Sequence, residues 1–130
     1  MMYALLLFGR FNTFRNMPTT LLVEDEETLG AMLKKFLDRT GMNCTWVKSG
    51  DEAVKILDDE FDMFITDTVM PGKVRGDELT RIIRAKFPDA PIILMSGTGE
   101  IPGHQADVFV AKPFLPMDLL GLAERLLQQS

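Results

Sequence analysis

The sequence predicts an α/β fold built on a parallel sheet, and two observations support this prediction. Five short, largely apolar runs are spread along the chain, and amphipathic helical stripes lie between most of them. Short apolar runs that alternate with amphipathic helices are typical of parallel strands buried on both faces. The five expected strands are Thr20–Glu24, Asn43–Val47, Met63–Thr66, Ile92–Met95 and Val108–Ala111.

Four segments have the apolar spacing of a helix that faces a sheet. The first begins at the acidic pair Glu26-Glu27 and ends at Gly41. The second begins at Ser49, and the third begins at Asp77-Glu78 and stops at Pro88. Acidic residues and serine favour helix N-termini, whereas glycine and proline end helices. The apolar stripes are Leu29-Met32-Leu33-Phe36-Leu37, Ala53-Ile56-Leu57, Leu79-Ile82-Ile83 and Leu119-Leu122-Ala123-Leu126-Leu127.

The last connection between strands interrupts this alternation. Residues 96–107 include three glycines and Pro102, and they lack an apolar stripe at helical spacing. A parallel crossover needs about a dozen residues, usually with a helix, and glycine and proline are poor helix formers. We therefore predict a loop with at most one helical turn, more mobile than the other crossovers.

The composition is that of one soluble globular domain. The chain has 130 residues, of which 46% are apolar and 25% charged, and its net charge is −5. Because no basic patch or zinc-finger spacing is present, we expect no direct contact with nucleic acid. Cys44 is the only cysteine, which excludes an intrachain disulfide. A buried, inert thiol fits a reducing compartment, so we expect a cytoplasmic protein.

Residues 1–16 differ from the rest of the chain, because they contain two arginines and no acidic residue. Their apolar stretch at 3–8 is far shorter than the ~20 residues that cross a bilayer, so we expect no membrane span. We interpret residues 1–18 as an N-terminal extension, or a start assigned too early, ahead of a domain at 19–130. The alternative is an amphipathic segment that docks on a partner or a membrane surface.

Charged residues directly follow three of the apolar runs. Glu24-Asp25 ends the first run, Asp67 follows the third and Lys112-Pro113 follows the fifth. Because ligands bind at the carboxyl ends of the strands in an open parallel sheet, these side chains should meet at one edge. Three carboxylates and one ammonium group there predict a site for a divalent cation and a phosphoryl group.

Five motifs in this order resemble those of response-regulator receiver domains, over about Thr19 to Leu127. The resemblance implies a flavodoxin-like, doubly wound five-stranded sheet of order 2-1-3-4-5, here with the fourth helix degenerate or missing. It also implies transfer of a phosphoryl group from a histidine kinase to one aspartate. The motifs are LLVEDEE at 21–27, ITDTVMPG at 65–72, GDEL at 76–79, PIILMSG at 91–97 and VAKPF at 110–114.

The resemblance also implies a role for each site residue. Asp67 is the expected nucleophile and forms an aspartyl-phosphate. Asp25 and Asp67 would ligate Mg²⁺ directly, with the Val69 carbonyl as a third ligand. Glu24 replaces the usual aspartate, and its longer side chain could ligate through water.

Further positions carry expectations of their own. Lys112 should pair with a phosphoryl oxygen, and Ser96 should donate its hydroxyl to the phosphoryl group. Phe109 matches the aromatic switch position of the family, or it is plain core. The loop at 73–75 is one residue longer than usual and adds two cations, either solvated or facing an anionic partner. His104 should be a surface residue.

Three functional classes remain open from the sequence. The leading one is a phosphoacceptor that catalyses only its own phosphorylation and dephosphorylation. A magnesium-dependent aspartyl-phosphate phosphatase would need an acid where Val69 stands, and a scaffold that works without phosphorylation would not need the acidic set. We expect that no output domain follows Ser130. We therefore expect a histidine kinase or phosphotransfer protein as donor and an unidentified protein as target. The oligomeric state stays open, with a homodimer as one alternative.

Overall fold

The computed structural model describes residues 17–129, so the expectations for residues 1–16 lie outside the described residues. Its sheet has the order β2-β1-β3-β4-β5, and every neighbouring pair is parallel, as predicted. β1 ends one residue earlier than expected, whereas β3 and β4 each run one residue further. The strands are β1 (Thr20–Val23), β2 (Cys44–Val47), β3 (Met63–Asp67), β4 (Ile92–Ser96) and β5 (Val108–Ala111).

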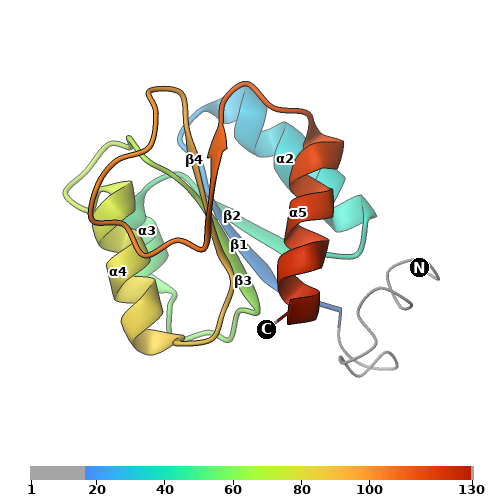
Figure 1. Ribbon diagram of the computed structural model, residues 1–130, viewed down its shortest axis with the longest axis horizontal. Helices are drawn as coiled ribbons and strands as arrows, with labels where there is room; N and C mark the ends of the chain where they lie inside the picture. The colour runs from blue at the N-terminus through green and yellow to red at the C-terminus, as the bar shows by residue number, and fades with distance from the viewer. Residues whose placement is uncertain (1–16, 130) are drawn as a thin grey trace.

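Four helices are described, and they cover the two faces of the sheet in pairs (Figure 1). One face packs against α2 and α5, which bury Leu33, Leu37, Ala123 and Leu127 in one core cluster. The other face packs against α3 and α4. The helices are α2 (Glu27–Arg39), α3 (Gly50–Lys55), α4 (Gly76–Lys86) and α5 (Pro116–Gln129).

The predicted helix ends agree with local hydrogen bonding. The Ser49 hydroxyl accepts the N–H of Glu52 at 3.1 Å, which caps the start of α3. Gly41 follows α2 with a φ of 87°, the left-handed backbone that glycine adopts at low cost. α3 is shorter than its apolar stripe, because the helix ends at Lys55 and Ile56 is its C-cap.

The crossover from β4 to β5 contains no helix, as the glycines and Pro102 predicted. Its second half is held against α4 by three side chains of that helix. Thr80 Oγ1 accepts the N–H of Gln105 at 2.9 Å, and Arg81 donates to the Gly103 carbonyl at 2.8 Å. Arg84 donates to the Gln105 carbonyl at 3.2 Å and to the Asp107 carboxylate at 2.8 Å.

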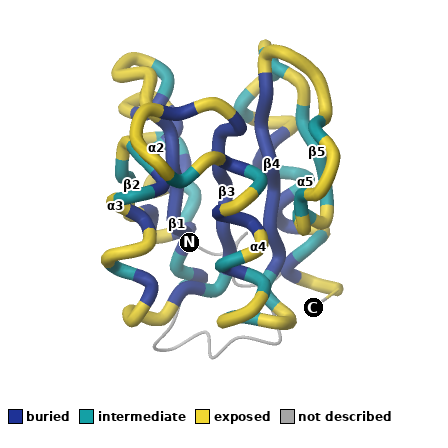
Figure 2. The backbone as a smooth tube through the Cα atoms, turned by 90° about the vertical axis from the view of Figure 1, so that its left-hand side faces the viewer, coloured by how far each residue is buried: buried dark blue, intermediate teal, exposed yellow. Residues whose placement is uncertain are grey.

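The edge strand β5 is less covered than the central strands. Figure 2 shows β1, β3 and β4 buried, whereas β5 is at best half-buried. Phe109 on β5 is half-buried and belongs to neither core cluster of the described residues. His104 lies at the surface, where it lines a hollow with Arg84 and Gln105, but it is partly buried there. Its side chain is only 11% exposed, because its two ring nitrogens bond Glu100 and the N–H of Ala106.

The only cysteine, Cys44, lies buried on the edge strand β2, and two charged side chains bond its backbone. The Asp38 carboxylate accepts the N–H of Cys44 at 2.6 Å, and Lys34 donates to the Cys44 carbonyl at 2.7 Å. Burial raises the pKa of the Cys44 thiol to about 12. The thiol is therefore protonated near neutral pH. No helix in the described part of the chain is both long and apolar enough to cross a membrane.

Candidate functional site

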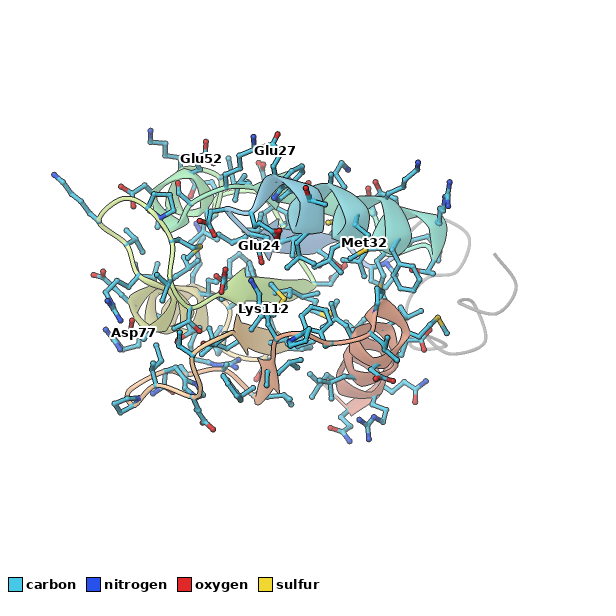
Figure 3. All side chains as sticks on the ribbon, turned by 90° about the horizontal axis from the view of Figure 1, so that it is seen from above. Glu24, Glu27, Met32, Glu52, Asp77 and Lys112 are labelled. Carbon is cyan, nitrogen blue, oxygen red and sulfur yellow. The ribbon has the colours of Figure 1, made fainter. Side chains whose placement is uncertain are left out.

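The side chains predicted to meet at one edge of the sheet do so. Glu24 directly follows β1, Asp67 and Ser96 are the last residues of β3 and β4, and Lys112 directly follows β5. Figure 3, which looks down on this edge, shows Glu24 and Lys112 pointing toward each other from opposite sides of the sheet's centre. The parallel topology alone brings these residues together across 88 positions of sequence.

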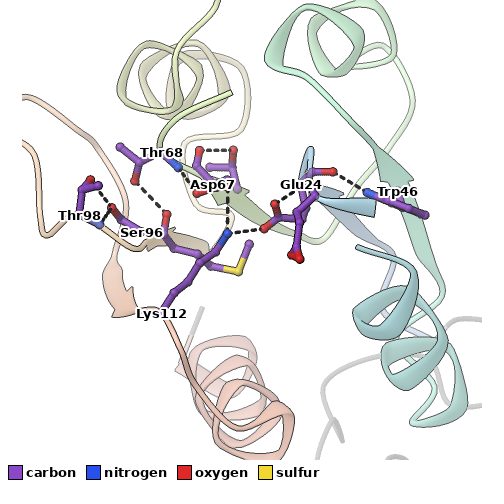
Figure 4. A network of polar contacts seen from close by, with 10 residues as sticks. Glu24, Trp46, Asp67, Thr68, Ser96, Thr98 and Lys112 are labelled. Carbon is purple, nitrogen blue, oxygen red and sulfur yellow. Dashed lines mark hydrogen bonds and ion pairs between the residues drawn. The ribbon is translucent and has the colours of Figure 1, made fainter. Parts of the chain in front are cut away.

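Lys112 links the two buried carboxylates of the site. Its Nζ lies 2.7 Å from Glu24 Oε1 and 2.9 Å from Asp67 Oδ2 (Figure 4). Burial by itself lowers the pKa of Lys112, but the hydrogen bonds to Glu24 and Asp67 outweigh it, so this pKa is raised. The ammonium group therefore stays charged, and it balances part of the negative charge of the site.

Glu24 is held at all of its polar atoms. Its Oε1 accepts from Lys112, and its Oε2 accepts the N–H of Glu26 at 3.0 Å. Its backbone N–H donates to the Val47 carbonyl at 3.0 Å, and its carbonyl accepts from the Trp46 indole at 2.8 Å. The side chain is fully buried, and burial raises the pKa of Glu24 against the opposing effect of its hydrogen bonds.

Asp67 is fixed at the end of β3 by its neighbour. Asp67 Oδ1 accepts the N–H of Thr68 at 2.8 Å, and Thr68 Oγ1 donates to the Met95 carbonyl at 2.8 Å. Gly76 lies so close that a Cβ there would clash with the Asp67 carbonyl, and its N–H donates to the Thr68 carbonyl at 3.0 Å. Sequence reasoning did not identify Thr68, because a buried threonine after a strand has no pattern of its own.

Three carboxylates come close enough to share a cation. Glu24, Asp25 and Asp67 each offer one oxygen, and these oxygens lie within 4.8 Å of one another. Asp25 is exposed, whereas the other two are buried. Mg²⁺ prefers oxygen ligands and keeps several waters, so an open cluster with one accessible carboxylate fits it. Val69 lies two residues beyond Asp67 with its side chain exposed.

Ser96 is in place, but its hydroxyl is engaged elsewhere. Ser96 Oγ accepts the N–H of Thr98 at 3.0 Å and lies 3.1 Å from Thr98 Oγ1 (Figure 4). The residue itself is buried at the end of β4, beside the strand that carries Asp67. Ser96 can therefore donate to a phosphoryl group when its hydroxyl hydrogen is not given to Thr98 Oγ1.

The longer loop after β3 is fastened to the start of α3. The carboxylate of Asp51 accepts the N–H groups of Lys73 and Val74 at 3.0 and 2.8 Å. These backbone donors hold the pKa of Asp51 below its usual value. Lys73 and Arg75 are exposed, and Arg75 pairs with Asp77 at 3.3 Å. Both cations thus point into solvent at the side of the site.

The sheet order defines a flavodoxin-like domain, and its acidic edge with a lysine lies at the carboxyl ends of the strands. The chain belongs to the response regulator receiver domain family, whose model matches residues 20–124. Receiver domains of this family are parts of two-component systems, and they interact with histidine kinases and phosphotransfer proteins. They are signalling domains and not enzymes in the usual sense.

Two curated relatives illustrate the similarity. The transcriptional regulatory protein CssR of Bacillus subtilis (strain 168) is 34% identical over 116 residues, covering 85% of this chain and 51% of CssR. Protein PetR of Rhodobacter capsulatus is 37% identical over 110 residues, covering 79% of this chain and 46% of PetR. The chain thus spans about half the length of these curated relatives.

Solved structures show the same likeness. The signal receiver domain of a signal transduction histidine kinase from Syntrophus aciditrophicus is 30% identical with a TM-score of 0.78, and the match covers 86% of this chain and 91% of that one. Response regulator protein TrrA from Thermotoga maritima, in complex with Mg(2+)-BeF, is 31% identical with a TM-score of 0.76. That match covers 85% of this chain and 99% of TrrA.

Proposed function

We propose that this chain is a phosphoacceptor: it takes a phosphoryl group from a histidine kinase or phosphotransfer protein onto Asp67 and signals through protein contacts. The observation that carries the proposal is the meeting of Asp67, Glu24, Asp25 and Lys112 at one edge of the sheet. Carboxylates that close repel one another, and a cation together with Lys112 would offset that repulsion.

The proposed phosphoryl transfer is a single displacement at phosphorus. A carboxylate oxygen of Asp67 attacks the phosphorus of a phosphohistidine, so that a P–O bond forms as the P–N bond breaks. The departing imidazole nitrogen keeps the electron pair and takes up a proton. Asp25 and Asp67 would hold Mg²⁺ directly with the Val69 carbonyl, and Glu24 would hold it through water. When bound, Mg²⁺ neutralises charge on the phosphoryl oxygens.

Two residues of the chain would change partners in this reaction. Lys112 now divides its hydrogen bonds between Glu24 and Asp67. A phosphoryl oxygen on Asp67 would offer it a more highly charged acceptor. Ser96 would donate its hydroxyl hydrogen to a phosphoryl oxygen while its oxygen keeps the N–H of Thr98, and this retained contact would link the chemistry to the start of the β4–β5 crossover.

An apolar surface beside the site supports a protein as the donor. A hollow of about 370 Å³ next to Lys112 is lined by Leu29, Pro113 and Phe114. Large apolar side chains nearby in the sequence are exposed, namely Met32, Leu115 and Met117. An apolar hollow beside a reactive edge is typical of an interaction surface.

Labelling with a small phosphodonor and Mg²⁺ tests the assignment of Asp67. Mass spectrometry should locate the modification on Asp67, and Asp67→Asn should abolish it. Asp59→Asn, at an exposed position outside the site, should be labelled like the unaltered chain. Asp25→Ala should weaken Mg²⁺ binding in a fluorescence titration of Trp46. Stoichiometric labelling of Asp67→Asn would overturn the assignment and favour a scaffold that works without phosphorylation.

The same site should lose its phosphoryl group slowly. Val69 is 59% exposed and has no group that could orient an attacking water, so general acid–base assistance is missing there. Val69→Asn and Val69→Glu should speed the decay of the phosphorylated form, measured as loss of label with time. Unchanged or slower decay in both variants would contradict this expectation.

A further inference from the structure

We infer that Trp46 is a positioning residue for the metal-binding segment, acting through Glu24 and Gly30. The inference rests on the proposed magnesium site and identifies what holds that site in shape. Trp46 lies on the edge strand β2, and its indole Nε1 donates to the Glu24 carbonyl at 2.8 Å (Figure 4). Its side chain therefore reaches over the end of the neighbouring strand to the residue that begins the acidic cluster.

The indole replaces a partner that the sheet no longer supplies. β1 ends at Val23, yet the N–H of Glu24 still donates to the Val47 carbonyl at 3.0 Å. The Glu24 carbonyl instead accepts from the Trp46 side chain. Since both backbone groups of Glu24 are bonded to β2, the chain direction is fixed just before Asp25, the exposed carboxylate of the cluster.

The same indole also fixes the other end of this segment. Gly30 lies in α2, and a Cβ at that position would clash with the Trp46 ring atoms that include Nε1. Glycine in a helix costs about 1 kcal/mol relative to alanine, so helix propensity alone does not favour it there. Its place is explained by the contact: only glycine lets α2 approach the ring. Trp46 therefore touches both ends of the segment 24–30 that carries Asp25.

The outer side of the ring is covered as well. Lys48 Nζ lies 5.5 Å from the centroid of the Trp46 ring and pairs with Glu27 at 2.7 Å. Glu27 is the first residue of α2, so this pair adds a second link between β2 and the segment. The ring thus contacts both α2 and a cation, and these contacts restrict its orientation.

Calorimetric titration with Mg²⁺ tests the inference on the full chain. Trp46→Phe keeps an apolar ring and removes the N–H donor. Because partners of the residues that hold a metal typically contribute 10- to 100-fold in metal affinity, we expect the Kd for Mg²⁺ to rise about tenfold. Thr45→Ala is the matched control: it alters an exposed residue of the same strand, leaves the indole N–H in place and should change this Kd by about twofold or less.

A second variant tests the contact with Gly30 independently. Gly30→Ala should weaken Mg²⁺ binding in the native background by displacing the indole. In the Trp46→Phe background it should have little further effect, because the smaller ring leaves room for a Cβ. Such non-additivity is the signature of two residues that act as one unit.

The outcomes separate the inference from the proposed function. Trp46→Phe with a lowered thermal midpoint but an unchanged Kd would show a merely structural tryptophan and overturn the inference. Additive effects of Trp46→Phe and Gly30→Ala would overturn it too. If the unaltered chain binds no Mg²⁺, the proposed function fails, and the inference fails with it.

Discussion

The crossover from β3 to β4 and the crossover from β4 to β5 connect neighbouring strands in different ways. The first contains α4, which packs through Leu79 and Ile83, both fully buried. The second contains no helix, and Ala106 is the only residue between β4 and β5 that packs against a described core cluster. Apolar burial orders the first connection, whereas hydrogen bonds to the side of α4 order the second.

The second crossover is itself divided into two parts. Its half at 103–107 bonds to Thr80, Arg81 and Arg84 of α4. In the half at 97–102, the side-chain bonds described are local ones, such as those of Thr98 to Ser96 and of Glu100 to His104. Side-chain bonds to a neighbouring helix can replace an apolar stripe, but only along the part of the loop that they reach.

The largest effect should follow from removing apolar burial in α4. Ile83→Ala deletes a fully buried side chain and should cost about 2–5 kcal/mol in the free energy of unfolding. Urea denaturation measures this loss. The half-buried neighbour Ile82 provides the control, and Ile82→Ala should cost clearly less. Equal losses at the two positions would mean that packing under α4 does not order this crossover.

A smaller effect should follow from removing the main link between α4 and the second crossover. Arg84 donates to the carbonyls of Pro88, Ala90 and Gln105 and to the Asp107 carboxylate. Arg84→Ala should cost about 1–3 kcal/mol in unfolding free energy, because these acceptors lose a charged donor. Hydrogen exchange should become faster at 105–107.

Arg81 is the matched residue for this experiment. It makes one bond to the Gly103 carbonyl and lies about half exposed on the same helix. Arg81→Ala should change the unfolding free energy by about 0.5 kcal/mol or less, as surface polar contacts usually do. If exchange at 105–107 were unchanged in Arg84→Ala, the arginine would not be the link that orders the loop.

A phosphoryl mimic at Asp67 should affect the two halves of the second crossover differently. We expect hydrogen exchange to slow at 97–102, because Ser96 would draw Thr98 and the adjoining backbone toward the site. The half at 103–107 is already bonded to α4 and should change little. Strong protection at 97–102 before the mimic is added, or no change there afterwards, would refute this expectation.

The smallest effects on the free energy of unfolding should come from two glycines in the half at 97–102. Gly99 has a φ of 99°, a backbone that disfavours any residue with a Cβ, whereas Gly97 has no such conformation. No atom lies within 4 Å of a Cβ built on either residue, so crowding does not distinguish them. Gly99→Ala should cost about 1 kcal/mol in unfolding free energy, and Gly97→Ala about zero. Identical thermal midpoints for both variants would show that this half has no defined backbone.

Most of the fold could be predicted, because apolar periodicity is a local property of the sequence. All five strands lie within one residue of their predicted ends, and the missing helix was visible in its glycines and in Pro102. The division of that crossover could not be predicted. It depends on which loop carbonyls fall within reach of Arg81 and Arg84 once α4 has packed on the sheet.

The site could be predicted where it depends on the order of the strands, but not where it depends on contacts between side chains of different strands. Glu24, Asp67 and Lys112 follow buried strands, so topology brought them together as expected. Thr68 and Trp46 could not be identified, since their bonds to Met95 and Glu24 join different strands. The bond between Ser96 and Thr98 joins residues two apart, but no sequence pattern shows that the hydroxyl is already occupied. The catalytic and metal-binding roles stay predictions.

The buried thiol of Cys44 is a native probe of local opening at strand β2 and of global unfolding. A protonated sulfhydryl shielded from solvent reacts with alkylating reagents only when strand β2 detaches or the whole domain unfolds. The rate of alkylation therefore measures how often strand β2 opens or the domain unfolds, and no label has to be introduced. The sequence has no other cysteine. A second thiol introduced at the exposed position Lys73 could therefore carry a spectroscopic tag beside the site, while the buried Cys44 remains unlabelled.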